Sequence, residues 1–126
     1  FFDENFFLYL EETDLCKRVK ESGEKIIEIN AEVSHLGNQS HKHHDSFEIE
    51  KSRNWHWMWS KFYFSKKHKG YILSIIVFFP ILIKLLMKLI FYFLLRNNKK
   101  FVISKKRFAG LLTSIVGKGS DYRPKI

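Results

Sequence analysis

A long apolar run near the middle of the chain constrains the fold more than any other feature. Residues 71–95 contain only four side chains that are not hydrophobic, namely Ser74, Pro80, Lys84 and Lys88. A helix that crosses a bilayer needs about 20 apolar residues, and the stretch before the first charge covers only residues 71–83. Pro80 is expected to kink or break the helix, whereas Lys84 and Lys88 share one helical face. The pattern favours two in-plane or re-entrant helices at a membrane surface, with the lysines reaching the headgroups; a single tilted span is the competing interpretation.

Charge divides the chain into two zones around this run. Residues 1–50 carry 5 basic and 12 acidic side chains, whereas residues 51–126 carry 17 basic and one acidic, so net charges of −7 and +16 make up the total of +9. Basic residues on both sides of the run, Lys99 and Lys100 among them, predict that both flanks face the cytoplasm at an anionic leaflet. These charges flank an apolar segment and match no nucleic-acid-binding motif, so we expect no nucleic-acid partner.

The pattern of apolar residues predicts an α/β fold for the acidic zone. Residues 6–10 and 25–29 read as short strands, with a further strand beginning at residue 31. A helix is expected to start at the acidic residues near position 11 and to stop at Gly23. We therefore divide the chain into residues 1–50, an aromatic basic helix at 51–70, the apolar membrane-associated segment at 71–95 and a basic amphipathic tail at 96–126.

Four residues in the acidic zone are candidates for chemistry. Glu11, Glu12 and Asp14 form a carboxylate cluster in which like charges raise proton affinity, as in a general base, although acidic residues are also common in the first turn of a helix. His35 follows a predicted strand and precedes a glycine-containing loop, where it could ligate a metal or be purely structural. The residues alone leave both alternatives open.

The motifs around these residues resemble a known family. Residues 2–18 read FDENFFLYLEETDLCKR, Gly23 follows, and residues 35–40 read HLGNQS. This sequence resembles the C-terminal half of family 2 glycosyltransferases, and most closely their bacterial rhamnosyltransferase-like branch, in which F-D-E-x-F-F-x-Y-x-E-D-x-D-L-C-x-R precedes H-x-x-G-x-S. The likeness is specific over residues 1–40 and looser over 41–70, where an aromatic helix ending in Lys-His is usual, as at Lys67 and His68.

The resemblance implies a fold and a reaction. The fold would be the C-terminal, acceptor-side part of a GT-A nucleotide-diphospho-sugar transferase, followed by a mainly helical membrane-associated tail. The reaction would be inverting transfer of a sugar from a nucleotide-diphosphate donor to a glycan acceptor, expected to be lipid-linked, in cell-envelope polysaccharide synthesis. The expected location is the cytoplasmic face of a bacterial cell membrane.

The resemblance also assigns roles to individual residues. Glu12 matches the catalytic base, with Glu where the pattern usually has Asp, while Glu11 and Asp14 would shape the acceptor site. His35 matches a ligand of a divalent metal, Mg²⁺ or Mn²⁺, whose remaining ligands are expected upstream. Because the chain contains no D-x-D motif and starts without Met, we expect a fragment that is inactive by itself.

Two residues of the aromatic helix are further candidates for substrate binding. Arg53 carries a guanidinium group that suits a lipid-linked diphosphate, and Trp55 could stack on a sugar. The neighbouring tryptophans are also expected to pack on the catalytic domain or to sit at a membrane interface. The alternative function is a non-catalytic, basic membrane-binding module, in which residues 51–126 form an aromatic anchor at the membrane interface.

Overall fold

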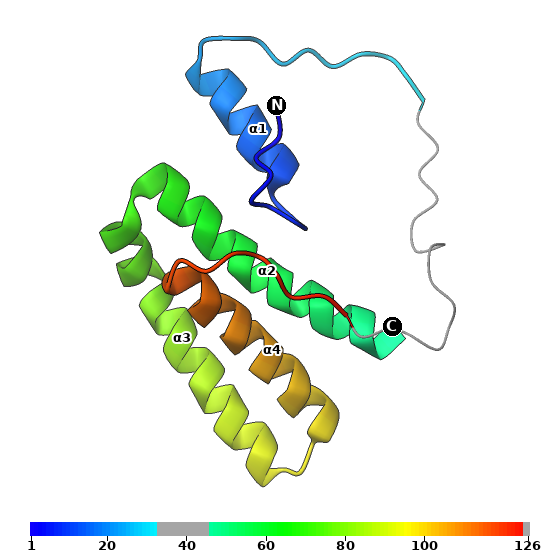
Figure 1. The fold of residues 1–126 in the computed structure, drawn as a ribbon, viewed down its shortest axis with the longest axis vertical. Coiled ribbons are helices and arrows are strands. Elements are labelled where there is room, and N and C mark those ends of the chain that lie inside the picture. The colour runs from blue at the N-terminus through cyan, green and yellow to red at the C-terminus, as the bar shows by residue number, and fades with distance from the viewer. Residues whose placement is uncertain (33–45, 125–126) are drawn as a thin grey trace.

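The computed structural model describes residues 1–32 and 46–124, and the regular structure in that part of the chain is entirely α-helical (Figure 1). Four helices follow one another along the chain: α1 (Glu11–Glu21), α2 (Ser46–Lys69), α3 (Tyr71–Leu94) and α4 (Asn98–Ile115). Helices α2, α3 and α4 pack on one another, and α1 lies beside the C-terminal half of α2. The α/β fold expected from the sequence, with its GT-A sheet, is therefore wrong for the described residues.

The predicted strands fail for identifiable reasons. Tyr9 and Leu10 have positive φ angles of 71° and 69°, so residues 6–10 turn sharply into α1 instead of extending. Residues 24–32 have no regular secondary structure, and Ile26, Ile27 and Ile29 are all exposed. A strand needs a neighbour to pair its backbone N–H and C=O groups, and none is present in the described part of the chain.

Helices α2 and α3 form an antiparallel pair with a tight connection. Gly70, with φ of 83°, lies between them and allows the chain to reverse. Helix α2 covers the aromatic segment for which a helix is expected, and α3 covers nearly all of the apolar run. Pro80 lies inside α3 without ending it, so the run forms one helix and not the two expected from its proline.

Helix α4 runs back along α3 and lies between α2 and α3 in Figure 1. At its N-terminus, Asn97 caps the helix by accepting a hydrogen bond from the Lys100 backbone N–H at 3.1 Å. The Tyr71 hydroxyl donates to the Ile115 carbonyl at 3.3 Å at one end of the α3–α4 pair, and the Phe93 and Phe101 rings meet at the other. The two helices are therefore paired along their whole length.

Apolar residues from all three helices form the core. Its buried members are Met58, Phe62, Phe78, Leu85 and Leu111. Helices α2 and α4 approach closely at Gly110, where an added Cβ would clash with the Trp55 carbonyl. Between α2 and α3, the Ser65 and Ser74 hydroxyls hydrogen-bond each other at 2.8 Å in a buried position. Small residues thus bring the helices into close contact, and large apolar ones fill the space between them.

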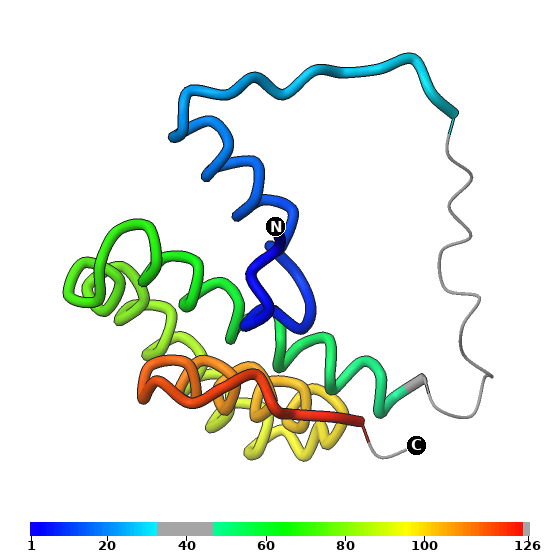
Figure 2. The backbone as a smooth tube through the Cα atoms, turned by 45° about the horizontal axis from the view of Figure 1, so that its top comes forward, coloured from blue at the N-terminus to red at the C-terminus, as the bar shows by residue number. Residues whose placement is uncertain are grey.

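Two irregular segments contact α2. The N-terminal segment reaches the middle of α2 in the tube view (Figure 2), and the C-terminal tail overlies α2 in Figure 1. The N-terminal segment accepts a hydrogen bond from the Ser60 hydroxyl through the Leu8 carbonyl, at 2.7 Å. The tail accepts one from the Trp59 indole N–H through the Lys118 carbonyl, at 3.0 Å. The Ser120 hydroxyl donates to the Asn5 carbonyl at 3.0 Å and joins the two segments to each other.

Candidate functional site

Helix α1 presents the three candidate carboxylates in its first turn. Its N-cap residue is Leu10, whose side chain makes no capping hydrogen bond, so the exposed N–H groups are left to the acidic side chains and solvent. Glu12 is exposed, whereas Glu11 is half-buried and its Oε2 atom is covered without a hydrogen-bond partner among the described residues. Asp14 is completely buried. Three neighbouring carboxylates therefore have three different environments.

Asp14 lies at the centre of a cluster of charged groups that fixes α1 to α2. The Arg18 Nε and Lys67 Nζ atoms donate to Asp14 Oδ2, each at 2.8 Å, and His68 Nε2 lies 2.8 Å from Oδ1. Burial by itself raises the pKa of the Asp14 carboxyl, but the hydrogen bonds from Lys67, Arg18 and His68 outweigh it and leave the pKa below its ordinary value. Asp14 is therefore ionised at neutral pH and is fully engaged by its partners.

Asp3 extends this cluster to the N-terminal segment. Lys67 Nζ donates to Asp3 Oδ2 at 2.6 Å, and the Tyr63 hydroxyl donates to the same oxygen at 3.1 Å. Partial burial opposes ionisation of Asp3, but the hydrogen bonds from Lys67 and Asn5 hold its pKa well below the ordinary value. Burial also opposes the charge on Lys67, and its two carboxylate partners overcome this and raise its pKa. We call Asp3, Asp14, Arg18, Lys67 and His68 the ion-pair cluster.

All members of the ion-pair cluster belong to the motif residues that carry the family resemblance. Asp3, Asp14 and Arg18 come from the N-terminal motif, and Lys67 and His68 are the Lys-His pair at the end of the aromatic helix. The sequence gives Asp14 a role at an acceptor site, whereas the structure buries it as the anchor of α1. The spacing of four between Asp14 and Arg18 indicates their pairing, but nothing in the sequence shows that Lys67 approaches both aspartates.

The two candidate substrate-binding residues on α2 differ in how far they are exposed to solvent. Arg53 is exposed, whereas the Trp55 side chain is only 5% exposed. The Trp55 ring stacks on Tyr122 with a centroid distance of 5.5 Å and contacts His56 edge-on at 4.8 Å. In this arrangement the indole packs against the C-terminal tail, and the role of Trp55 in sugar stacking stays a prediction.

His56 is a buried histidine for which the sequence offers no particular signal. Its side chain is fully covered, Nε2 lies 2.8 Å from the Tyr122 carbonyl oxygen, and Nδ1 has no partner in the described part of the chain. Burial lowers the pKa of His56, opposed by the hydrogen bond to Tyr122 and assisted by the nearby Arg123 charge. The neutral imidazole holds the C-terminal tail against α2.

The predicted metal ligand His35 lies outside the described residues. Within residues 1–32 and 46–124, no group of three or more His, Cys, Asp or Glu side chains is arranged to hold a metal ion. The Mg²⁺ or Mn²⁺ site that the resemblance implies stays a prediction, because His35 is the one ligand that the resemblance assigns to this chain.

The predicted membrane-facing lysines lie on or next to α3. Lys84, Lys99 and Lys100 are exposed and Lys88 is half-buried. By length and composition, α3 is the one helix in the described part of the chain that could cross a membrane, a property that buried helices of soluble proteins also have. Only 17% of its most apolar window is buried against the rest of the chain.

Comparison of the chain with protein-family models, with curated proteins and with solved structures finds no match in any of the three.

Proposed function

We propose that the chain is the acceptor-side part of an inverting, membrane-associated glycosyltransferase, in which Glu12 is the general base. The observation that carries the proposal is the ion-pair cluster: residues of the N-terminal motif and the Lys-His pair at the end of the aromatic helix, about 50 to 65 positions apart, meet in space and hold α1 in place. The proposal rests on these residues and not on the fold, because the described part of the chain is helical.

The cluster distinguishes Asp14 from Glu12, two of the three carboxylates of α1 to which the resemblance assigns roles. Asp14 is buried and neutralised by cations, so it cannot take up a substrate proton without losing three partners. Glu12 lies two residues earlier, is exposed, and has neither a hydrogen bond nor an ion pair within the described residues. Of these two carboxylates, Glu12 is therefore the one that is free to accept a substrate proton, while the ion-pair cluster fixes the helix that carries it.

In the proposed reaction, Glu12 accepts the proton of an acceptor hydroxyl as its oxygen attacks the anomeric carbon of the donor sugar. The bond from that carbon to the diphosphate oxygen breaks, and the nucleoside diphosphate leaves from the opposite face with the bonding electrons. The configuration at the anomeric carbon is thereby inverted. The acceptor is a glycan, which we propose to be lipid-linked because α3 offers an apolar surface in the same chain.

The test is a substitution series in the whole protein that carries this chain. Release of nucleoside diphosphate is measured with a panel of nucleotide sugars and with lipid-linked glycan as acceptor. Glu12→Gln should lower turnover by about 10²–10⁴-fold, the usual contribution of a general base, while donor binding stays the same. Glu12→Asp, which introduces the residue usual in the motif, should retain activity, and the exposed Glu24→Gln serves as the matched control. Near-normal turnover of Glu12→Gln would remove Glu12 from this role.

A non-catalytic membrane-binding module is the second candidate, and the exposed apolar face of α3 favours it specifically. It predicts that the whole protein binds anionic vesicles but releases no nucleoside diphosphate from any donor in the panel. The two candidates are separated by measuring vesicle binding and sugar transfer on the same preparation.

A further inference from the structure

The outward side of α3 is a continuous apolar stripe. Residues spaced three or four apart form it, and each is between 44% and 77% exposed: Ile72, Ile76, Phe79, Ile83, Met87 and Ile90. We call this set the outer face of α3. The opposite side of the helix, with Ser74, Phe78 and Leu85, is buried against α2 and α4. An apolar surface of this length is far larger than a soluble chain ordinarily leaves in water, and it therefore requires a covering partner.

The charges around the outer face identify the partner. Lys84 and Lys88 border the stripe, and residues 51–126 contain 17 basic side chains and one acidic. A second copy of this chain would bring like charges together at the edge of the contact, whereas an anionic lipid headgroup layer complements them. The outer face therefore fits a bilayer better than it fits itself.

The length of α3 does not decide how it meets the bilayer. Its 24 residues would extend about 36 Å, which is enough to cross a hydrocarbon core of about 30 Å. The packing of α4 does decide it. Contacts at Tyr71–Ile115 and Phe93–Phe101 pair the two helices from end to end.

Helix α4 carries five cations: Lys99, Lys100, Lys105, Lys106 and Arg107. A spanning α3 would carry these side chains into the hydrocarbon, where each charged group is strongly disfavoured, or would have to separate from α4. An in-plane α3 keeps the packing of α2, α3 and α4 and leaves the cations of α4 in the aqueous or headgroup region. The helix pairing thus favours the in-plane arrangement.

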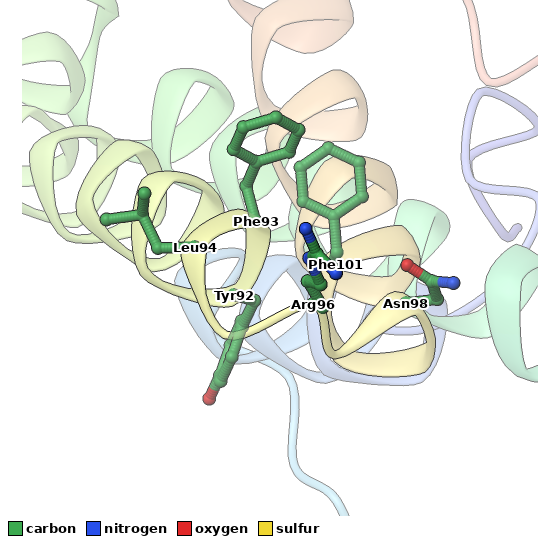
Figure 3. A pocket seen from close by; sticks show the side chains of 6 residues that line it. All are labelled: Tyr92, Phe93, Leu94, Arg96, Asn98 and Phe101. Atoms are coloured by element: carbon green, nitrogen blue, oxygen red, sulfur yellow. The ribbon is translucent and has the colours of Figure 1, made fainter.

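Both ends of α3 carry the residues that membrane interfaces favour. Helix α2 ends in the basic sequence Lys66–Lys69, which one residue separates from Tyr71. Lys67 and His68 of this sequence are engaged in the ion-pair cluster, which leaves Lys66 and Lys69 for the headgroups. At the other end, Tyr92, Phe93 and Phe101 line a hollow together with Leu94, Arg96 and Asn98 (Figure 3). Aromatic rings and cations at both ends suit the headgroup level, a pattern that in-plane and spanning helices share, so the packing of α4 remains the feature that favours the in-plane arrangement.

We propose that α3 lies in the plane of an anionic membrane surface, with its outer face in the acyl-chain boundary and both of its ends on the same side. The inference rests on the membrane association included in the proposed function and is independent of the role of Glu12. Helices α2 and α4 then lie at or above the headgroups, and α1 is carried outside the lipid on the C-terminal half of α2.

The test uses the whole chain with Cys16→Ser, so that introduced cysteines are the only thiols. Anionic vesicles of phosphatidylcholine and phosphatidylglycerol are compared with vesicles of phosphatidylcholine alone. Lys69→Cys and Asn97→Cys mark the two ends of α3, and both positions are exposed. A membrane-impermeant maleimide outside the vesicles should label both. A fluorophore on Ile83→Cys should report an apolar environment, and one on the matched Lys105→Cys of α4 should remain in water.

Each outcome decides the inference. Labelling of both ends with a shielded Ile83 probe supports it, and labelling of only one end overturns it in favour of a spanning helix, while membrane association still holds. Absence of vesicle binding, with self-association in solution, overturns it in favour of a second copy. Lys84→Gln with Lys88→Gln should weaken binding to anionic vesicles by about 25-fold, or about fivefold for each lysine, and unchanged binding would contradict the charge argument. Failure of the proposed sugar transfer would appear in none of these measurements.

Discussion

Helix α1 and the three helices α2–α4 are held by opposite kinds of interaction. The three helices pack through buried apolar residues and close backbone contacts at small residues. Helix α1 contacts α2 through the ion-pair cluster, in which the side chains of Arg18 and Lys67 are still 35% and 26% exposed. The proposed catalytic helix is therefore attached by few, directional and titratable contacts, whereas the proposed membrane-binding part is held by many apolar contacts.

Removal of the Asp14 charge should have the largest effect, because it should release α1 and leave the packing of α2–α4 intact. Asp14→Asn leaves Lys67, Arg18 and His68 without their shared anion, and breaking such a buried arrangement costs about 3 kcal/mol. The expected result is loss of hydrogen-exchange protection in α1 by about two orders of magnitude, with α2–α4 unchanged. Glu12→Gln, at an exposed position on the same helix, is the control, and equal protection of α1 in both variants would contradict the proposed anchor.

Substitution of Gly110 tests the close packing of α2 against α4. Gly110→Ala places a Cβ against the Trp55 carbonyl, which is backbone and can yield only if α2 and α4 move apart. We expect a loss of about 1–3 kcal/mol in the free energy of unfolding of α2–α4, measured by thermal or denaturant unfolding. Lys105→Ala, an exposed change on the same helix, should stay within about 0.5 kcal/mol. A stabilised Gly110→Ala variant would show that the close approach is not tight.

Acidification should separate the C-terminal tail from the helices before it affects α1. The folded-state pKa of His56 is lower than the ordinary 6.5, so below about pH 6.5 the unfolded chain binds more protons than the folded one. The stability contributed by neutral His56 is therefore present above pH 6.5 and decreases as the pH falls toward the folded-state pKa. Faster backbone hydrogen exchange in residues 117–124 as the pH falls should reveal this loss of stability.

Two results would distinguish His56 from other acid-sensitive groups. His56→Gln, which does not titrate, should remove the change near pH 6.5, and persistence of the change would assign it elsewhere. The carboxylates Asp3 and Asp14 have lowered pKa values, so the stability they contribute is present above about pH 4 and is lost only on further acidification. Protection of α1 should accordingly survive the pH at which the tail detaches.

The smallest effect is expected at the surface of α1. Lys17 and Glu21 form an exposed ion pair at 2.8 Å, one turn apart. Because solvent screens such a pair, Lys17→Ala should leave the protection of α1 unchanged within error. A loss comparable to that of Asp14→Asn would mean that α1 is stabilised by its own helix pairs and not by its contact with α2.

Sequence reasoning succeeds here where a pattern is local and fails where it depends on a partner. The acidic residues near position 11 and Gly23 predict the two ends of α1 correctly, because a few adjacent residues determine where a helix begins and ends. The strands at 6–10 and 25–29 are wrong because apolar runs this short do not distinguish strand from irregular structure. The meeting of Lys67 with Asp3 and Asp14 spans more than 50 residues, so only the fold reveals it. Pro80 suggests a break, yet α3 continues through it.

The hydrogen bonds that fasten the two irregular segments to α2 have a consequence for mutational tolerance. In three of these bonds the group on α2 is a side chain, that of Ser60, Trp59 or His56, and the group on the segment is a main-chain carbonyl, that of Leu8, Lys118 or Tyr122. Asp3 is the exception, because its own carboxylate accepts from Tyr63 and Lys67. A carbonyl is supplied by any amino acid, so Leu8 and Lys118 can vary without loss of these bonds. Their partners on α2 cannot vary in the same way. In a collection of functional variants, these three bonds should therefore conserve Ser60, Trp59 and His56 of α2, whereas Leu8 and Lys118 should vary more freely.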